Sequence, residues 1–144
     1  MNNKYLIDTN VLIYALDNNS IFHESVNNLI YQPNIELFTT SKNLVEFISV
    51  VTKGESPAFT MQQALNHVKT FESLITILFP SKQTYSIFID LLDEYKPNGL
   101  KVHDFEIAAI GIANGITTLV TANTKDFSAI KQISLIKISP DKIS

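Results

Sequence analysis

The chain has 144 residues, of which 45% are hydrophobic and 17% charged, the composition of a globular protein rather than a disordered one. It contains no cysteine, so disulfides, zinc–thiolate sites and thiol nucleophiles are excluded. The net charge of −3 is a weak argument against sequence-independent binding of nucleic acid, which usually needs a basic surface. Carboxylates that hold metal ions contribute to that sum, so a nuclease is not excluded.

We expect one domain over residues 1–144, because this length is usual for a chain that builds a single core. The N-terminal segment has no basic stretch followed by a long apolar run, and no apolar stretch is long enough to span a bilayer. We therefore expect a cytoplasmic protein that makes no use of a membrane.

The first part of the chain predicts two strands and two helices. A short buried strand ends at Asp8, and Asp8, Thr9 or Asn10 is available to cap the helix that follows. The expected ranges are 4–7 and 35–39 for the strands, and 11–16 and 20–31 for the helices.

A further helix is predicted over residues 41–54, with Ser41 as its cap and Gly54 at its end. Its apolar side chains recur at helical spacing and form one stripe, which consists of Leu44, Phe47, Ile48 and Val51. Glu46 lies roughly opposite this stripe. It is therefore either a solvated glutamate or, given its apolar neighbours, a functional one.

Two longer helices are expected over residues 60–74 and 81–95, with a strand over 75–79 between them. Ser81 is the expected cap of the second. The side chains expected to face inward are Met61, Leu65, Val68 and Phe71 or Glu72 in the first helix, and Tyr85, Phe88, Ile89 and Leu92 in the second.

The last part of the chain predicts a helix of small residues over 104–114, which alanine and glycine allow to pack close to a sheet. Two strands, over 118–121 and 133–138, and one helical turn over 127–130 complete the chain. Strands that alternate with helices indicate an α/β protein with a parallel sheet covered on both faces. Functional residues in such sheets gather beyond the carboxyl ends of the strands.

Four acidic residues are candidates for a metal site: Asp8, Glu46, Asp104 and Asp126. Mg²⁺ and Mn²⁺ bind hard oxygen ligands through a few carboxylates, and different strands can bring distant acids to one rim. One or two such ions activate water and stabilise the leaving oxygen of a phosphodiester. Each acid also has a simpler interpretation, since three of them can cap helices and Glu46 can be a solvated side chain.

Four polar residues stand beside these acids: Thr9, Asn10, Thr121 and Asn123. They either orient a carboxylate or a water molecule, or they serve as turn residues. The three histidines show no metal-ligand spacing. His103 adjoins Asp104, but a lone histidine is more often structural, and it is left out of the expected site.

Four segments, in their order and spacing, together resemble the PIN-domain family, and in particular its VapC-like toxin ribonucleases. They are YLIDTNVLIYAL at 5–16, SKNLVEF at 41–47, HDFEIAAIGIANGITTLVT at 103–121 and TANTKDF at 121–127. Each segment alone is a weak signal, but their combination over nearly the whole chain is specific.

The resemblance implies a three-layer α/β/α fold with a five-stranded parallel sheet, and it implies that Asp8, Glu46 and Asp104 belong to a metal site. Many members of the family carry Asp where Asn123 stands, so we expect Asp126 as the fourth acid and Asn123 as its support. Residues that resemble the supporting polar side chains of the family are Thr9, Asn10 and Thr121.

The activity implied by the resemblance is endonucleolytic cleavage of RNA with Mg²⁺ or Mn²⁺ as cofactor. The implied partners are an RNA substrate, an antitoxin protein and a second copy of the chain in a homodimer. The main alternative is an inactive PIN-like module that binds RNA or protein. A haloacid-dehalogenase-type phosphatase needs an acid at position 10, where this chain has asparagine, and a receiver domain needs an acidic pair after its first strand.

Overall fold

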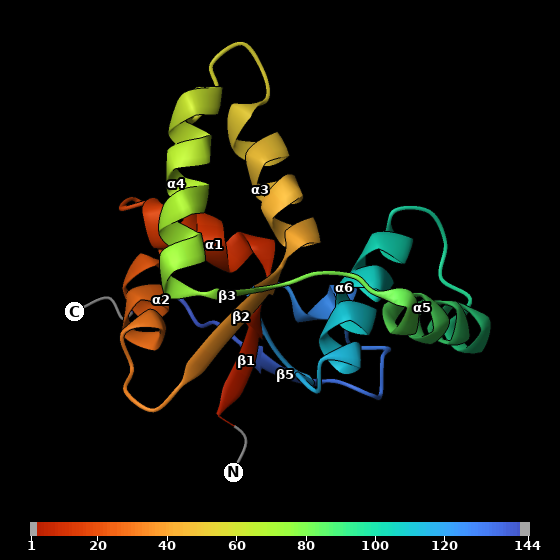
Figure 1. Ribbon diagram of the computed structural model, residues 1–144. Helices are drawn as coiled ribbons and strands as arrows, with labels where there is room; N and C mark the ends of the chain where they lie inside the picture. Colours follow the sequence, from red (N-terminus) through yellow and green to blue (C-terminus); the bar gives the residue numbers. More distant parts are fainter. Residues whose placement is uncertain (1–2, 142–144) are drawn as a thin grey trace.

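The computed structural model describes residues 3–141, which fold around one five-stranded parallel sheet (Figure 1). The strand order is β3-β2-β1-β4-β5, and every neighbouring pair is parallel. The strands are β1 (Lys4–Ile7), β2 (Glu36–Thr40), β3 (Thr76–Leu78), β4 (Thr118–Thr121) and β5 (Ser134–Lys137). The α/β class and the five parallel strands are therefore confirmed.

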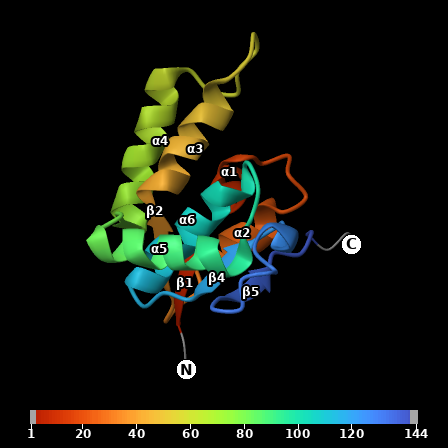
Figure 2. The same cartoon turned by 90° about the vertical axis from the view of Figure 1, so that its right-hand side faces the viewer.

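Helices connect these strands and cover both faces of the sheet. They are α1 (Thr9–Leu16), α2 (His23–Ile30), α3 (Ser41–Thr52), α4 (Met61–Leu74), α5 (Lys82–Tyr95), α6 (Lys101–Ala113) and the 3₁₀ helix η1 (Thr124–Asp126). Figures 1 and 2 show α5 and α6 on one side of the sheet and α1 to α4 on the other, so the expected three layers are present. No helix of the described residues has the length and apolar character needed to cross a bilayer.

The two hydrophobic cores follow from the alternation of side chains along the strands. In β1, Leu6 packs against the core that α5 and α6 complete, and the next residue, Ile7, packs into the core on the other face. β2 and β4 repeat the pattern with one residue for each core, in the pairs Phe38 and Leu37, and Leu119 and Val120. The central strands are apolar on both sides because both faces are covered.

Helix α6 lies close to the sheet because Gly111 has no side chain. A Cβ atom at this position would stand 2.7 Å from the carbonyl oxygen of Ile116 and 3.0 Å from Cδ2 of Leu6 in β1. The expected close packing of this small-residue helix is confirmed. It brings the helix that carries Asp104 against the strand that leads into Asp8.

Several helix boundaries differ from the prediction. Helix α3 is capped by Thr40 rather than Ser41, through a capping box with Asn43. Helix α2 begins at His23 rather than at residue 20, and α6 begins at Lys101, three residues before the expected start. The helical turn expected over 127–130 is the 3₁₀ helix η1, which lies three residues earlier.

The inward faces of α4 and α5 were predicted only in part: Phe71 is buried, and Val68, Phe88 and Leu92 pack against the two cores as expected. Four side chains expected in the core are exposed: Met61, Leu65, Tyr85 and Ile89. The buried positions that the prediction missed are Ala64 in α4, and Thr84 and Leu91 in α5. A helical period fixes the spacing of a stripe, but the neighbouring element decides which stripe is covered.

Candidate functional site

The site begins where the two central strands end. Asp8 directly follows β1, Thr121 is the last residue of β4, and the two strands are neighbours in the sheet. The backbone N–H of Asp8 donates to the carbonyl of Val120 at 3.0 Å. This hydrogen bond holds the start of α1 beside β4. Residues separated by more than a hundred positions therefore meet at the carboxyl edge of the sheet, as expected for this architecture.

The carboxylate of Asp8 is buried, with 8% of the residue exposed, and four donors surround it. Oδ1 accepts hydrogen bonds from the backbone N–H of Thr9 at 2.9 Å and from Nδ2 of Asn43 at 3.3 Å. Oδ2 accepts from Oγ1 of Thr121 at 2.8 Å and, at 3.5 Å, from Nδ2 of Asn10. Asp8 is thus the cap of α1 and also the centre of a polar network, so the two interpretations of this residue hold together.

Asn43 links the capping of α3 to this carboxylate. Its Oδ1 accepts from the hydroxyl and the backbone N–H of Thr40, at 2.7 and 3.3 Å. Its Nδ2 donates to Asp8 and, at 3.0 Å, to Oγ1 of Thr9. The sequence prediction missed Asn43, although its place three residues after Thr40 is the signature of a capping box.

The other three candidate acids line a cleft of about 870 Å³ beyond this edge of the sheet, and Glu106 lines it as well. Glu46 comes from α3, Asp104 from the first turn of α6, and Asp126 from η1. Asp104 does not cap α6, whose cap residue is Leu100. Glu46 is exposed as a residue, in line with its place opposite the buried stripe, but the surface it faces is this cleft.

The electrostatics of the cleft appear most clearly at Asp104. Partial burial, together with the negative charges of Asp126, Asp8 and Glu46, raises the pKa of its carboxyl from an ordinary value of 3.8 to about 7. Lys101 lowers this pKa, but only in part. The surroundings of Asp104 therefore disfavour its ionised form relative to an exposed aspartate.

The other acids respond to the same neighbours. Burial raises the pKa of Asp8, and the charge of Asp126 adds to that effect, while the hydrogen bonds from Thr121 and Thr9 oppose it. Burial and the charge of Asp8 raise the pKa of Glu46, and His103 lowers it. The four carboxyl groups consequently act on one another electrostatically, although they come from separate segments of the chain.

A divalent cation fits this set of groups by its chemistry. The available donors are hard carboxylate oxygens, the kind that Mg²⁺ and Mn²⁺ prefer, and a cation would relieve the repulsion that raises the pKa values. The described side chains do not, however, form a ready-made cluster of three acidic or histidine groups around one point. The fit therefore rests on donor type, charge and a shared cleft.

Asn123 and Asp126 are joined by a hydrogen bond, in which Nδ2 of Asn123 donates to Oδ2 of Asp126 at 3.1 Å. Of the two, Asp126 lines the cleft and Asn123 is exposed. The backbone N–H of Asn123 also donates to Oγ1 of Thr121 at 3.1 Å. Asp126 as the fourth acid with Asn123 as its support is consistent with this geometry and stays a prediction.

The prediction also missed three groups with basic side chains in the cleft wall: Lys42, Lys101 and His103. His103 was set aside as a lone histidine, but it precedes Asp104 in the first turn of α6, and both line the cleft. The adjacency of His103 and Asp104 in the sequence was the available signal. Its significance became clear only once α6 was known to begin at Lys101, which places both residues in its first turn.

A family model described as the PIN domain matches residues 5–133 of the chain. No curated protein sequence matches it significantly. Among solved structures, VapBC2 from Rickettsia felis, bound to a DNA fragment from its promoter, has a similar chain. That chain is 24% identical, with 94% of this chain and 99% of the other covered and a TM-score of 0.73.

Two other solved structures have the same fold. A toxin-antitoxin complex from Klebsiella pneumoniae contains a chain 20% identical, with 94% of this chain and 98% of the other covered and a TM-score of 0.66. VapC20 from Mycobacterium tuberculosis, a toxin that cleaves the sarcin-ricin loop, is 11% identical, with 80% and 86% covered and a TM-score of 0.64. Identities this low establish a common fold.

Proposed function

Because the chain belongs to the PIN domain family, we propose that it is an endoribonuclease that depends on Mg²⁺ or Mn²⁺. The observation that carries the proposal is that Glu46, Asp104 and Asp126 line one cleft and that their charges, with that of the buried Asp8, act on one another. Four mutually repelling carboxyl groups destabilise a folded protein unless protons or a cation neutralise part of their charge. Their retention at the edge of a parallel sheet supports a catalytic role.

In this proposal the four acids hold the cation, and polar side chains keep the acids in place. A divalent cation held by carboxylates activates a water molecule for attack on a phosphodiester and stabilises the charge that develops on the phosphate. Thr121 and Asn10 direct their donors at Oδ2 of Asp8 and so fix the orientation of its carboxylate. Asn123 does the same for Asp126.

We further propose that the protein is the toxin of a bacterial toxin-antitoxin pair and works in the cytoplasm as a homodimer. The Klebsiella neighbour is a toxin-antitoxin complex and the Mycobacterium neighbour is a toxin that cleaves RNA, which supports this assignment by analogy. The test is growth of a bacterial host in which the protein is expressed. Arrest by the intact chain but not by its Asp8→Asn variant supports the assignment.

The competing function is an inactive PIN-like module that binds RNA or protein. Two observations favour it: the described residues include no ready-made three-ligand cluster, and asparagine occupies position 123. An inactive module has no need of a cation. Thermal unfolding separates the two functions, because a ligand that binds only the folded state raises the melting temperature.

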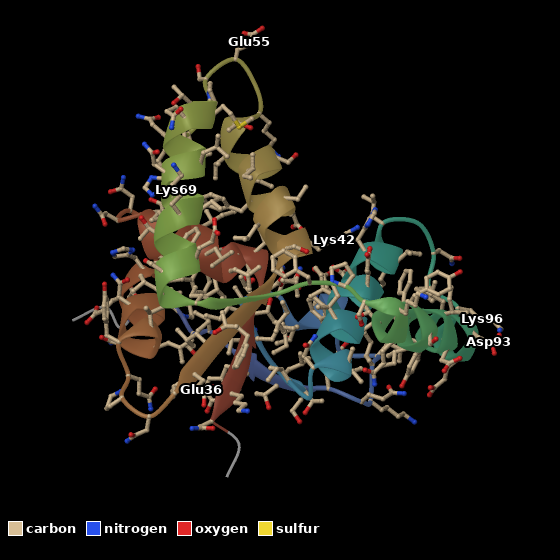
Figure 3. The ribbon with its side chains drawn as sticks, in the orientation of Figure 1. Glu36, Lys42, Glu55, Lys69, Asp93 and Lys96 are labelled. Carbon is tan, nitrogen blue, oxygen red and sulfur yellow. The ribbon has the colours of Figure 1, made fainter. Side chains whose placement is uncertain are left out.

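The decisive experiment uses purified protein, a labelled RNA, and Mn²⁺, Mg²⁺ or EDTA. We expect cleavage with either cation, none with EDTA, and a loss of several orders of magnitude in Asp104→Asn. The matched control is Asp93→Asn, since Asp93 is exposed near the end of α5, far from the cleft (Figure 3). Unchanged cleavage by Asp104→Asn, or no thermal shift with millimolar Mn²⁺, contradicts the proposal.

A further inference from the structure

An ion pair spans the cleft between α3 and α6. Nζ of Lys42 lies 2.8 Å from Oε1 of Glu106, and the two side chains are 31% and 29% exposed. Figure 3 shows Lys42 between the lower end of α3 and α6. Both residues line the same cleft as Asp104 and Glu46. The pair therefore stands beside the proposed site of phosphodiester cleavage rather than on a remote surface.

Lysine is the only strongly basic residue available to this protein. The chain has no arginine, so all 11 of its strongly basic residues are lysines, against 14 acidic residues. Two of these lysines, Lys42 and Lys101, line the cleft, and His103 lies with them. A polyanion that enters an acidic cleft needs cations on the protein as well as the metal, because like charges otherwise repel it.

The ammonium group of Lys42 is suited to exchange one anion for another. An ammonium is a compact charge with rotatable donors on a flexible stem, so it pairs with either a carboxylate or a phosphate. In a half-buried position such a charge is costly to leave unpaired, and Glu106 supplies a partner in the absence of a ligand. A carboxylate that pairs with a lysine at a nucleic-acid site occupies the place a phosphate takes.

We propose that Lys42 binds a backbone phosphate of the RNA next to the cleaved bond, and that Glu106 is an internal competitor for this lysine. This inference rests on the proposed function, of which it names a substrate-positioning residue. When RNA enters the cleft, Lys42 exchanges the carboxylate of Glu106 for a phosphate. Glu106 thereby lowers the affinity for RNA and keeps the ammonium inside the cleft in the free protein.

The apolar side chains of the same wall favour a nucleic-acid strand over an isolated phosphate. Val45 of α3 is 68% exposed and Leu100, at the start of α6, is 84% exposed, and both line the cleft. Exposed apolar groups beside a cation are suited to the sugar and base faces of a nucleotide. The cleft is also larger than one phosphate group, at about 870 Å³.

The test measures binding of a fluorescent single-stranded RNA by anisotropy with Mg²⁺ present, and all proteins carry Asp104→Asn so that the RNA stays intact, which gels confirm. We expect Lys42→Gln to weaken binding about tenfold, the effect of one charge-assisted hydrogen bond. The slope of log affinity against log salt becomes shallower by about 0.7, the value for one lost phosphate contact on a single strand. Lys42→Arg keeps the charge and restores the slope.

Lys69→Gln is the matched control, because Lys69 is exposed on α4 away from the cleft (Figure 3). This control variant changes neither the affinity nor the slope.

Glu106→Gln tightens binding. The gain shrinks in the Lys42→Gln background, because Glu106 acts by competing with the RNA phosphate for Lys42. If the ion pair serves only to hold α3 against α6, both Lys42→Gln and Glu106→Gln lower the melting temperature and leave the salt slope unchanged.

The inference is overturned if Lys42→Gln keeps the slope of its Asp104→Asn parent, if Glu106→Gln gains equally with and without Lys42, or if that parent does not bind RNA. Failure of the proposed function gives a different result. In that case RNA binding depends on Lys42, but the protein that retains Asp104 shows no cleavage with Mn²⁺ or Mg²⁺. If Lys42→Gln does not fold, Lys42→Arg and Glu106→Gln still decide the matter, since the competitor model requires tighter binding from the latter.

Discussion

The hydroxyl of Thr121 donates a 2.8 Å hydrogen bond to Oδ2 of Asp8 across the ends of the two central strands. Both residues are buried, and Thr121 is fully inaccessible to solvent. The same hydroxyl oxygen accepts from Nδ2 of Asn10 and from the backbone N–H of Asn123. One threonine therefore connects the first acid to the loop that carries the fourth.

Replacement of Thr121 by valine removes this donor while keeping the shape of the side chain. We expect the free energy of unfolding at pH 7 to fall by about 1.5–3 kcal/mol, because a buried carboxylate loses a charge-assisted hydrogen bond. The pKa of Asp8 rises further, since that hydrogen bond now lowers it. Chemical denaturation and the thermal shift with Mn²⁺ measure the two effects.

The matched control is Thr39→Val. Thr39 is equally buried in β2, but its hydroxyl donates to the carbonyl of Ile7 rather than to an acid. This variant is destabilised without any change in the response to Mn²⁺. If both variants lose the same share of the cation-induced shift, the hydroxyl of Thr121 has no specific role at the site.

Asp104 predicts how stability depends on pH in the absence of a cation. Its pKa is raised from 3.8 to about 7, so the folded protein holds the proton more tightly than the unfolded chain does. The contribution of Asp104 to the free energy of unfolding is fully present below pH 3.8 and is lost as the pH rises from 3.8 to 7. Above pH 7 the free energy of unfolding no longer changes through this group. We therefore expect the cation-free protein to lose stability between pH 5 and 7.

The Asp104→Asn variant removes this titration. At pH 8 we expect it to be more stable than the intact protein by about 1–2 kcal/mol, after allowance for the partial exposure of the side chain. Its stability also varies less between pH 5 and 8. Denaturation in EDTA at several pH values measures this, with Asp93→Asn as control. A less stable Asp104→Asn protein at pH 8 would refute the electrostatic account.

A substitution at Asn43 can separate its role in the capping of α3 from its hydrogen bond to Asp8. In Asn43→Asp the remaining carboxylate still accepts from Thr40, so the capping box of α3 is retained. The donor to Asp8 is lost, and a second negative charge faces that buried carboxylate. We expect a loss of about 1–3 kcal/mol at pH 8 that recovers in part at pH 5 and further at lower pH, as the new carboxyl is protonated.

Denaturation curves at the two pH values test this, and Asn43→Ala is the comparison. The alanine variant loses the cap as well, at a cost of about 0.5–2 kcal/mol that does not depend on pH. A pH-independent loss in Asn43→Asp would show that a charge at position 43 does not act on the carboxylate of Asp8.

The sequence predicted the sheet and its site edge because both depend on local patterns. Apolar pairs such as Leu6 and Ile7 mark a strand covered on both faces, and the polar residue that follows marks its end. Asp8 was therefore identifiable from its position. Glu46, Asp104 and Asp126 were candidates by residue type alone, and only the resemblance to a family implied that Glu46 and Asp104 share a site with Asp8, because no local pattern joins them.

The missed groups depend on the phase of helices, which the sequence does not determine. The roles of Lys42 and Asn43 could be recognised only once Thr40, one residue before the expected Ser41, was known to be the cap of α3. His103 entered the cleft because α6 begins at Lys101 rather than at Asp104. Part of the inward faces of α4 and α5 was mispredicted for the same reason, since tertiary contacts choose among equally spaced stripes.

Gly111 predicts that the site depends on the distance between α6 and the sheet. In Gly111→Ala the new Cβ would contact the backbone oxygen of Ile116 at 2.7 Å, and backbone cannot move aside as a flexible side chain does. Alanine favours a helix over glycine by about 1 kcal/mol, but overpacking typically costs about 1–3 kcal/mol. We expect a net loss of stability together with reduced cleavage, because a displaced α6 moves Asp104 relative to Asp8. Denaturation and the RNA cleavage assay measure the two effects, and a variant as stable and active as the intact protein would show that α6 tolerates a wider separation from β1.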